Sequence, residues 1–231
     1  MATPRLASPG LAPVHQAAIE YPETDGEPLG ESRIHVFATI ALVDALYVYF
    51  RDHPDVYVTA DLFLYYQEGN PRARVAPDVM VVKGVPKLER RVYKLWEEKV
   101  PPCTVFEIIS RATWREDTVT KSALYARLGV KEYLMFDPEG DSLPEPLVGF
   151  RLEDEMYAPI PAEPDGTLPS AELGLGFRAE GHYLRAFELA TGQPLPTIAE
   201  AVDRAKAEAA RAEREAARLN PRRLRYQDLV H

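Results

Sequence analysis

Hydrophobic and polar positions follow periods along the chain that predict an ordered series of helices and strands. Between residues 31 and 50, apolar residues recur at the spacing of an amphipathic helix that packs on a sheet. Residues 56–58 and 62–66 are short β-branched and aromatic runs, and they predict two strands joined by a tight connection. Residues 78–82 and 104–109 are nearly continuous apolar runs with one acidic residue each, which is typical of central strands buried on both faces.

The middle of the chain predicts a further helix and a further strand. Residues 86–102 are charged and aromatic, and they indicate a surface excursion with a short helix. Residues 117–128 have a helical pattern that ends at Gly129, a residue suited to a C-cap. Residues 132–136 return as a strand, and the order strand, helix, strand is compatible with a parallel pair.

Beyond residue 140 the pattern predicts β-structure of a different kind. Short apolar pieces at 147–152, 156–160 and 182–184 are separated by proline and glycine, and they indicate a β-rich flank that closes the core. The Gly174 to Gly176 segment lacks the strand-to-helix context of a phosphate-binding loop, so we interpret it as a turn.

Composition divides the chain into three parts. Residues 1–29 contain five prolines and predict an irregular arm. Residues 30–196 are long enough for one well-buried core. Residues 197–231 begin with a capping box at Thr197 and Glu200 and continue with a run rich in alanine, glutamate and arginine, which predicts a long charged helix. Because its large apolar residues are few, we expect weak self-association at most.

The sequence indicates a protein of the cytoplasm. It has no uninterrupted apolar run of the roughly 18 residues that a bilayer-spanning helix requires, and its first residues lack the apolar core of a signal peptide. Cys103 is the single cysteine, so it cannot form an internal disulfide. This fits a reducing compartment and excludes a cysteine-rich zinc module.

Charge argues against a protein whose main role is to coat nucleic acid. The net charge is -9, whereas non-specific affinity for DNA comes from lysine and arginine. Residues 197–231 hold eight basic and six acidic residues, which leaves 19 basic and 30 acidic residues in the body. A nuclease remains compatible with this charge, because a divalent ion bound by clustered carboxylates inverts the local potential.

Three polar side chains fall where two central strands and the following helix bring them together. Asp78 follows a proline at the start of a strand, and Glu107 lies within a strand, where a carboxylate must be paired, protonated or bound to a metal. Two carboxylates from adjacent strands suit Mg²⁺, with the carbonyl of Ile108 as a further ligand. Lys121 could orient the attacking water and stabilise the charge that develops on a phosphate.

The same residues also have structural interpretations, and spacing alone favours these. Asp78 could cap a turn, Glu107 could form a structural ion pair, and Lys121 could be a solvated helix residue. Lys121 also lies four residues after Asp117, the spacing of a helical salt bridge. His35 either reaches the same site or packs at the start of the first helix, and the packing interpretation is favoured.

A family resemblance changes this balance. The motifs that carry it are Pro77-Asp78, residues 105–110, residues 115–117 with Lys121 and Tyr125, residues 129–133 and residues 136–138. Together they resemble the Uma-two family of restriction endonuclease-like proteins, a branch of the PD-(D/E)xK nuclease superfamily. The resemblance runs from about Thr24 to the charged C-terminal helix. It implies an α/β fold with a restriction endonuclease-like core, a mixed β-sheet flanked by helices, and Mg²⁺-dependent nuclease activity.

The resemblance also assigns roles to single residues. Asp78 matches the aspartate of the PD motif, and Glu107 matches the acidic residue of the (D/E)xK motif. Ile109 stands where the superfamily has its lysine, and Lys121 from the following helix is the substitute. Glu31 resembles the acid that the first helix of many such nucleases contributes, although an acid at a helix N-terminus also favours the helix dipole.

Two functions from different classes follow. The first is an endonuclease that hydrolyses DNA with Mg²⁺ or Mn²⁺ held by Asp78, Glu107 and the carbonyl of Ile108, acting as a homodimer away from membranes. The second is a non-catalytic module that keeps the nuclease fold and binds a partner, or a second copy, through its helical tail. Metal binding separates the two, because a degenerate site should lose its affinity for Mg²⁺ and Mn²⁺.

Overall fold

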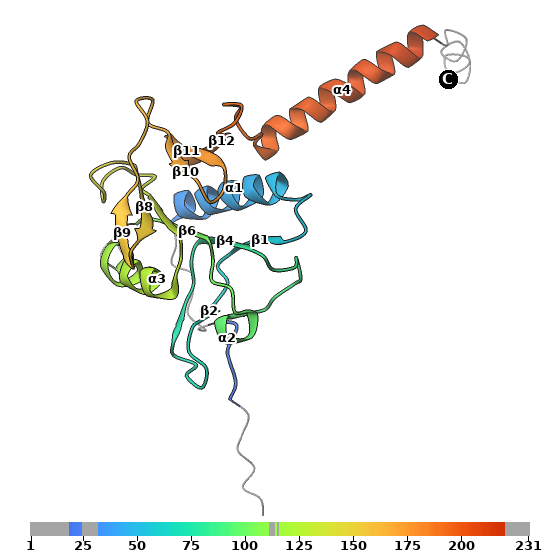
Figure 1. Ribbon diagram of the computed structural model, residues 1–231. Coiled ribbons are helices and arrows are strands. Elements are labelled where there is room, and N and C mark those ends of the chain that lie inside the picture. Colours follow the sequence, from blue (N-terminus) through green and yellow to red (C-terminus); the bar gives the residue numbers. More distant parts are fainter. Residues whose placement is uncertain (1–18, 25–31, 111–113, 115, 220–231) are drawn as a thin grey trace, which may run out of the picture.

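The protein has an α/β architecture in which helices flank a mixed β-sheet (Figure 1). A computed structural model describes residues 19–24, 32–110, 114 and 116–219. Glu31 and most of the predicted N-terminal arm lie outside these described residues, as do residues 220–231.

The main sheet has six strands in the order β1-β4-β6-β7-β8-β9. Their bounds are Val56–Ala60 for β1, Val79–Lys83 for β4, Thr104–Ile108 for β6, Glu132–Phe136 for β7, Leu147–Glu153 for β8 and Met156–Pro159 for β9. Strands β6 and β7 are parallel, and every other neighbouring pair is antiparallel. All residues of β6 and β7 are buried, and so are all but the last of β4. The two acidic, mainly apolar runs are therefore central strands, as predicted.

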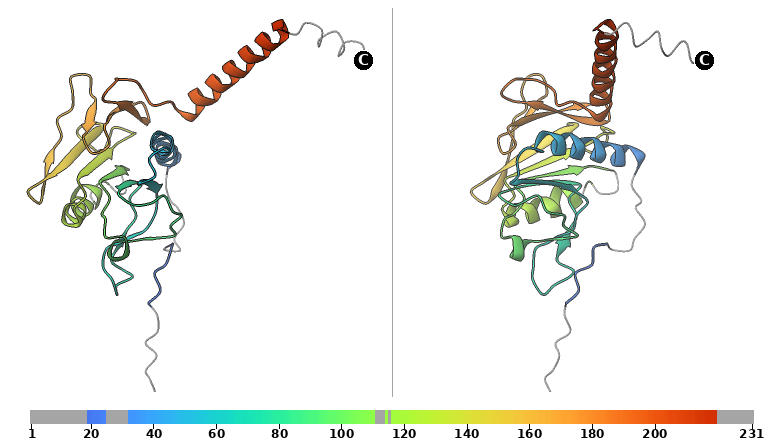
Figure 2. Two further views of the ribbon diagram at one scale, coloured as in Figure 1. Left: turned by 45° about the vertical axis from the view of Figure 1, so that its right-hand side comes forward. Right: turned by 90° about the vertical axis from the view of Figure 1, so that its right-hand side faces the viewer.

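One helix covers each face of this sheet (Figures 1 and 2). Helix α1 (Arg33–Tyr49) begins at Ser32, whose hydroxyl caps the helix by accepting the His35 backbone N–H at 3.1 Å. Side chains of β6 alternate between two cores, as the pleat of a strand requires. Phe106 packs in the core that includes α1, whereas Val105 packs in the core that includes α3 (Ser122–Leu128).

A second sheet packs over α1. It contains β10 (Leu168–Ser170), β11 (Leu175–Glu180) and β12 (Tyr183–Glu188) in that order. Of the three pieces predicted to form a β-rich flank beyond residue 140, only residues 182–184 reach this sheet, whereas residues 147–152 and 156–160 extend the main sheet as β8 and β9. The prediction of a turn is confirmed at Gly174, where φ is 69°, but Gly176 lies within β11. A Cβ atom at Gly176 would approach the Thr167 side chain to 2.5 Å, so glycine is required there for close packing.

The two strands predicted at residues 56–58 and 62–66 are present and are joined by only three residues, but they do not pair with each other. Strand β1 pairs with β4, whereas β2 (Leu64–Tyr65) joins a small sheet with β3 (Arg74–Val75) and β5 (Tyr93–Lys94). Asp61 adopts a left-handed φ of 49°, and its N–H donates to the carbonyl of Pro77 at 3.2 Å. This turn directs the chain away from β1 before a hairpin can form. The short helix predicted within residues 86–102 is α2 (Leu95–Glu98).

The described part of the predicted arm, residues 19–24, packs against the small sheet. The hydroxyl of Tyr65 donates to the carbonyl of Pro22 at 2.5 Å. The hydroxyl of Tyr21 accepts the Gly69 N–H at 2.8 Å, and its ring lies 5.2 Å from that of Trp96. This segment is irregular, as predicted, but it is anchored to the body.

The helix predicted at residues 117–128 is present in two forms. Residues Glu116–Lys121 form a π-helix, η1, which continues directly into α3. The helix ends at Gly129, which has a φ of 83° and donates its N–H to carbonyls of the last turn. Gly129 is therefore the predicted C-cap of α3, and the wider π-helical turn, which carries Lys121, comes immediately before α3.

Helix α4 (Ile198–Leu219) projects from the body (Figure 1). Its capping box forms as predicted, because the Glu200 N–H donates to the Thr197 hydroxyl at 3.2 Å and the Thr197 N–H donates to the Glu200 carboxylate at 2.9 Å. Glu200 also accepts from Arg185 of β12 at 2.8 Å, which ties the start of the helix to the second sheet. None of the helices among the described residues has both the length and the apolar content needed to cross a bilayer.

The single cysteine should react slowly in the folded protein. Cys103 is buried, and this burial raises the pKa of its thiol to about 11. At pH 8, the thiolate fraction is then on the order of 100-fold lower than for an unperturbed thiol. We expect a disulfide reagent such as DTNB, followed by absorbance, to react at least about 100-fold more slowly with native protein than with protein in urea. Equal rates in the two states would contradict the buried position.

Candidate active site

The two predicted carboxylates meet at one end of β4 and β6. Val79 of β4 pairs with Phe106 of β6, so Asp78 and Glu107 are the next residues along the two antiparallel strands. Asp78 is buried, and Glu107 is 1% exposed. Each carboxylate therefore depends on partners within the protein for its stabilisation.

Both oxygens of Glu107 accept hydrogen bonds from the helical segment that follows its strand. The ammonium of Lys121 donates to Oε2 at 2.8 Å, and the hydroxyl of Tyr125 donates to Oε1 at 2.6 Å. Lys121 ends η1 and Tyr125 lies four residues later in α3, so both side chains lie on the same side of the helical segment. The Lys121 side chain is 17% exposed, which contradicts its interpretation as a solvated helix residue.

Tyr125 is a neutral donor to Glu107. Its side chain is fully buried, and this burial is the main cause of a phenol pKa well above its usual value. The negative charge of Glu107 and the hydrogen bond between the two groups raise the pKa further. The phenol therefore keeps its proton at neutral pH and holds one carboxylate oxygen in place.

Asp78 is held by the neighbouring strand and by the first helix. Its Oδ2 accepts the backbone N–H of Ile108 at 2.5 Å. Its Oδ1 lies 3.4 Å from Nε2 of His35, and both side chains are mostly buried. His35 thus reaches the site from the first turns of α1, which decides between the two alternatives left by the sequence.

The two isoleucines beside Glu107 lie in different environments. Ile109 is buried in the core under α3, and its N–H donates to the Phe136 carbonyl in β7 at 2.7 Å. The Ile108 N–H points the other way, toward Asp78. Because the N–H and C=O groups of one residue in an extended strand point to the same side, the Ile108 carbonyl also faces the Asp78 side.

The donor set fits a hard divalent ion. No group of three or more histidine, cysteine, aspartate or glutamate side chains is placed to hold a metal among the described residues. The expected set needs only two such side chains, Asp78 and Glu107, together with the Ile108 carbonyl, whereas Glu31 falls outside the part of the chain described. Carboxylate and carbonyl oxygens are the ligands that Mg²⁺ and Mn²⁺ prefer.

The structure therefore brings together Asp78, Glu107, Ile108 and Lys121. It places His35 beside Asp78, which is one of the two alternatives left by the sequence, and it adds Tyr125, to which the sequence assigned no role at the site. Tyr125 had a detectable signal, because it follows Lys121 at helical i,i+4 spacing. His35 gave a weaker signal, because α1 also contains the polar residues Arg33, Thr39 and Asp44. Its contact with Asp78 depends on how α1 docks on the sheet, which no local pattern encodes.

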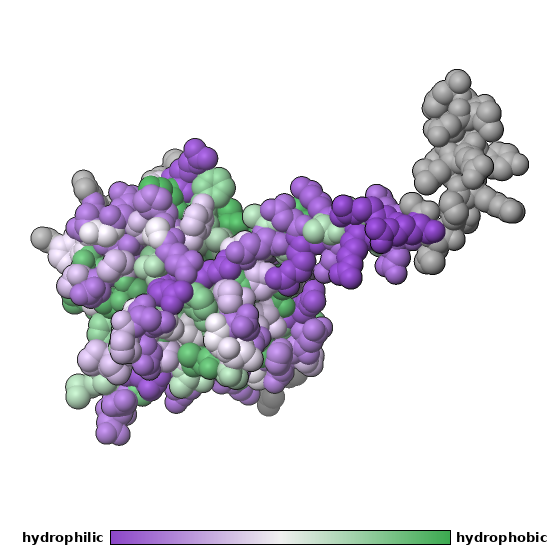
Figure 3. All heavy atoms as spheres, turned by 90° about the horizontal axis from the view of Figure 1, so that it is seen from above, coloured by the Kyte–Doolittle hydropathy of each residue, from purple (hydrophilic) through white to green (hydrophobic). Residues whose placement is uncertain are grey.

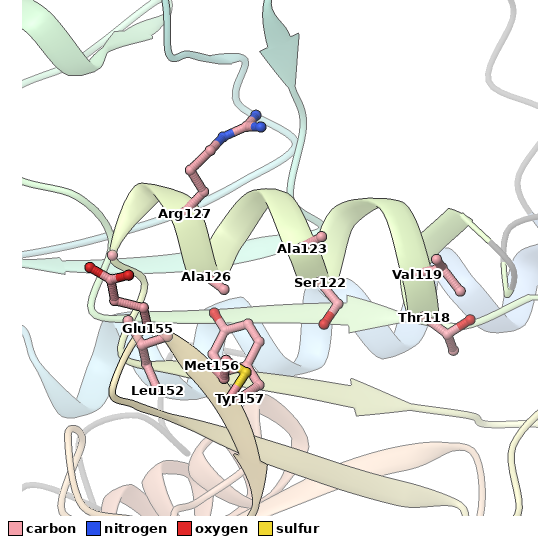
Figure 4. Close-up of a pocket in the computed structure, with 11 residues that line it drawn as sticks. Thr118, Val119, Ser122, Ala123, Ala126, Arg127, Leu152, Glu155, Met156 and Tyr157 are labelled. Atoms are coloured by element: carbon pink, nitrogen blue, oxygen red, sulfur yellow. The ribbon is translucent and has the colours of Figure 1, made fainter.

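A groove of the surface is separate from this cluster. This groove of about 850 Å³ lies between the outer face of the η1–α3 segment and β9, where Ser122, Arg127, Met156 and Tyr157 are among its lining residues (Figure 4). It contains neither of the buried carboxylates. The candidate site is thus identified by its cluster of charged groups and not by the volume of a cavity.

Comparisons with known proteins identify the family of the chain. The Uma2 family model, described as "Putative restriction endonuclease", matches residues 15–186, which is more than half of the chain. A similar solved structure is the crystal structure of a "putative nuclease belonging to DUF820" from Anabaena variabilis ATCC 29413. The two share 13% identity with a TM-score of 0.46, over 65% of this chain and 81% of that chain. The comparison with curated proteins gives no match.

Proposed function

Since the chain belongs to the Uma2 family of restriction endonuclease-like proteins, we propose that it is a metal-dependent nuclease that hydrolyses phosphodiester bonds of DNA. The observation that carries this proposal is the 2.8 Å contact between Lys121 and Glu107, beside Asp78. Ile109, at the position of the superfamily lysine, would by itself favour a non-catalytic module. Lys121 offsets this loss, because it brings an amine to the same carboxylate from the helix.

The residues of the site divide the chemical work. Asp78, Glu107 and the Ile108 carbonyl would hold Mg²⁺ or Mn²⁺, which supplies Lewis acidity to the phosphate and lowers the pKa of a bound water. Lys121 donates hydrogen bonds to the attacking water and stabilises the negative charge that develops on the phosphate oxygens. Tyr125 and His35 are positioning residues, since they contact the carboxylates.

Action on DNA as a homodimer in the cytoplasm completes the proposal. A symmetric dimer presents two sites, one for each strand of a duplex. The slightly basic segment 197–231 contrasts with the acidic body and offers cations for the phosphate backbone. Cys103 is a free, buried thiol, which fits a reducing compartment.

Cleavage assays on the full-length chain test the nuclease activity. We expect single- or double-stranded DNA to be cut in Mg²⁺ or Mn²⁺ and to stay intact in EDTA. Asp78→Ala should lower both metal affinity, measured by calorimetry, and the cleavage rate by at least about 100-fold, because it removes a ligand. Asp165→Ala is the matched control, since Asp165 is exposed and its contacts with Arg178 and with the Thr167 N–H lie at the surface.

Two outcomes would contradict the proposal. One is folded, metal-loaded protein that cuts neither DNA nor RNA, which would favour the binding module. The other is cleavage that survives Asp78→Ala unchanged, which would place the active site elsewhere.

A further inference from the structure

Helix α1 exposes an apolar face that nothing in the described structure covers. Its large apolar side chains on this face are 38% to 60% exposed, and they are Val36, Phe37, Ile40, Tyr47 and Val48. The opposite face buries Ala38, Leu42 and Leu46 in the core. A helix that is apolar on both sides is suited to packing against two partners, and contiguous exposed apolar surface of this kind marks protein–protein contacts.

The exposed face has the spacing of a helix-packing stripe. Arg33, Phe37, Ile40, Asp44 and Tyr47 follow one another at intervals of four, three, four and three residues. This repeat averages 3.5 residues, so its members stay in line along a neighbouring helix that runs at a small angle to the first. The shape of the stripe therefore fits another helix.

We infer that this face binds the same face of a second copy of the chain, with the two α1 helices antiparallel. In an antiparallel pair whose two-fold axis passes between Ala38 and Thr39, Phe37 of one copy lies opposite Ile40 of the other. In the same register, Arg33 lies opposite Asp44. Two-fold symmetry repeats each contact, so two apolar layers at the centre are flanked by two ion pairs.

Charge selects this register over the alternatives. Moving one helix by seven residues sets Asp44 against Ile40 and Arg33 against Arg51, which buries an unpaired carboxylate and opposes two cations. A parallel pair sets Asp44 against Asp44 and Arg33 against Arg33. The antiparallel register centred near Ala38 is therefore favoured, because it alone among the three opposes charges of different sign.

Both charged residues are available for these contacts. The Arg33 guanidinium lies over the ring of Phe37, a residue of the apolar face, at 5.2 Å. The Asp44 side chain has no ion pair with any residue in the described part of the chain. Helix α4 starts near α1 and then leads away from the body (Figure 1), and most of its length is hydrophilic (Figure 3). The exposed face of α1 is thus a larger apolar surface than the one that α4 offers.

Charge exchange tests the register directly. Sedimentation velocity of the full-length chain should show a dimer for the wild type. Arg33→Asp alone and Asp44→Arg alone should each raise the dissociation constant of the dimer at least about tenfold. Each change places like charges opposite each other at both of the symmetry-related contacts. The double variant carrying both changes should recover the wild-type dissociation constant, since it restores both ion pairs with their signs reversed.

A second variant keeps the test decisive if the charges contribute little. Phe37→Glu should give a monomer, whereas Met156→Glu, which changes another highly exposed apolar residue, should leave the dimer intact. Thermal melts establish that each variant is folded. A monomeric wild type, a dimer unaffected by Phe37→Glu, or a dimer dissociated only by Ile198→Glu at the start of α4 would overturn the inference.

This interface deepens the proposed homodimer but does not depend on nuclease activity. If the wild type is a dimer and the variants respond as expected, but no DNA is cut, the interface stands and the proposed nuclease activity is contradicted. If the protein is a monomer that cuts DNA, the nuclease activity stands and the interface is contradicted.

Discussion

Replacing Lys121 with alanine is expected to lower the rate of DNA cleavage about 100- to 1,000-fold, the usual effect of removing one donor that stabilises developing charge. The lysine ammonium lies 2.8 Å from Glu107, so it is close to any phosphate bound beside that carboxylate. Metal affinity should change far less than in Asp78→Ala, because an ammonium is not a metal ligand. Single-turnover cleavage and calorimetric titration with Mn²⁺ measure the two effects separately.

Lys131→Ala is the matched control for this variant. Lys131 is exposed at the start of the neighbouring strand β7, and we expect full activity without its side chain. Lys121→Arg keeps a positive charge beside Glu107 and shows whether charge alone is sufficient. Wild-type cleavage by a folded Lys121→Ala protein would contradict the role of this lysine and the displaced motif together.

Replacing Glu132 with alanine is expected to cause the largest loss of stability, about 3 kcal/mol. Glu132 of β7 has no exposed surface, and its Oε1 accepts from Arg151 and from the Ala171 N–H, each at 3.0 Å. Its Oε2 accepts from the hydroxyl of Ser170, which is also fully buried. Removing the carboxylate leaves the buried hydroxyl of Ser170 without its acceptor and removes the hydrogen bonds that Arg151 and the Ala171 N–H donate, which weakens the link between the main sheet and β10.

Thermal and urea unfolding measure this loss. A loss of this size lowers the Tm of a chain of this length by about 6 to 12 °C. Glu180→Ala provides the control, because Glu180 forms an exposed ion pair with Arg178 and should contribute less than about 1 kcal/mol. Equal unfolding midpoints for the two variants would show that the buried network does not stabilise the fold.

The central strands and the flanking helices could be predicted because each had a strong local signal. The runs at 78–82 and 104–109 are more continuously apolar than the alternating pattern of a half-buried strand. The helical period of residues 31–50 extends over several turns. The small sheet gave no comparable signal. Its strands have two residues each, and its pairing depends on the turn at Asp61, whose left-handed backbone is not specific to its residue type.

The candidate site was predictable in part for a similar reason. Asp78 and Glu107 interrupt apolar runs, so their burial could be inferred before their surroundings were known. Lys121 could be placed near them from the order strand then helix, but the family resemblance was needed to favour a catalytic role over a structural one, since its contact with Glu107 spans 14 residues of sequence. His35 contacts Asp78 across 43 residues, and such a contact arises from tertiary docking rather than from any local period.

The assembly of the site from a strand and a helix has a consequence for its control. Both carboxylates belong to the sheet, which is among the most deeply buried parts of the protein, whereas the amine and the phenol are carried by one helical segment at the surface. Segments of this kind open locally at lower free energy than central strands. Any ligand or modification that loosens this segment would therefore separate the Lys121 amine from Glu107 while the sheet stays folded, so the candidate site would be lost reversibly without denaturation of the protein.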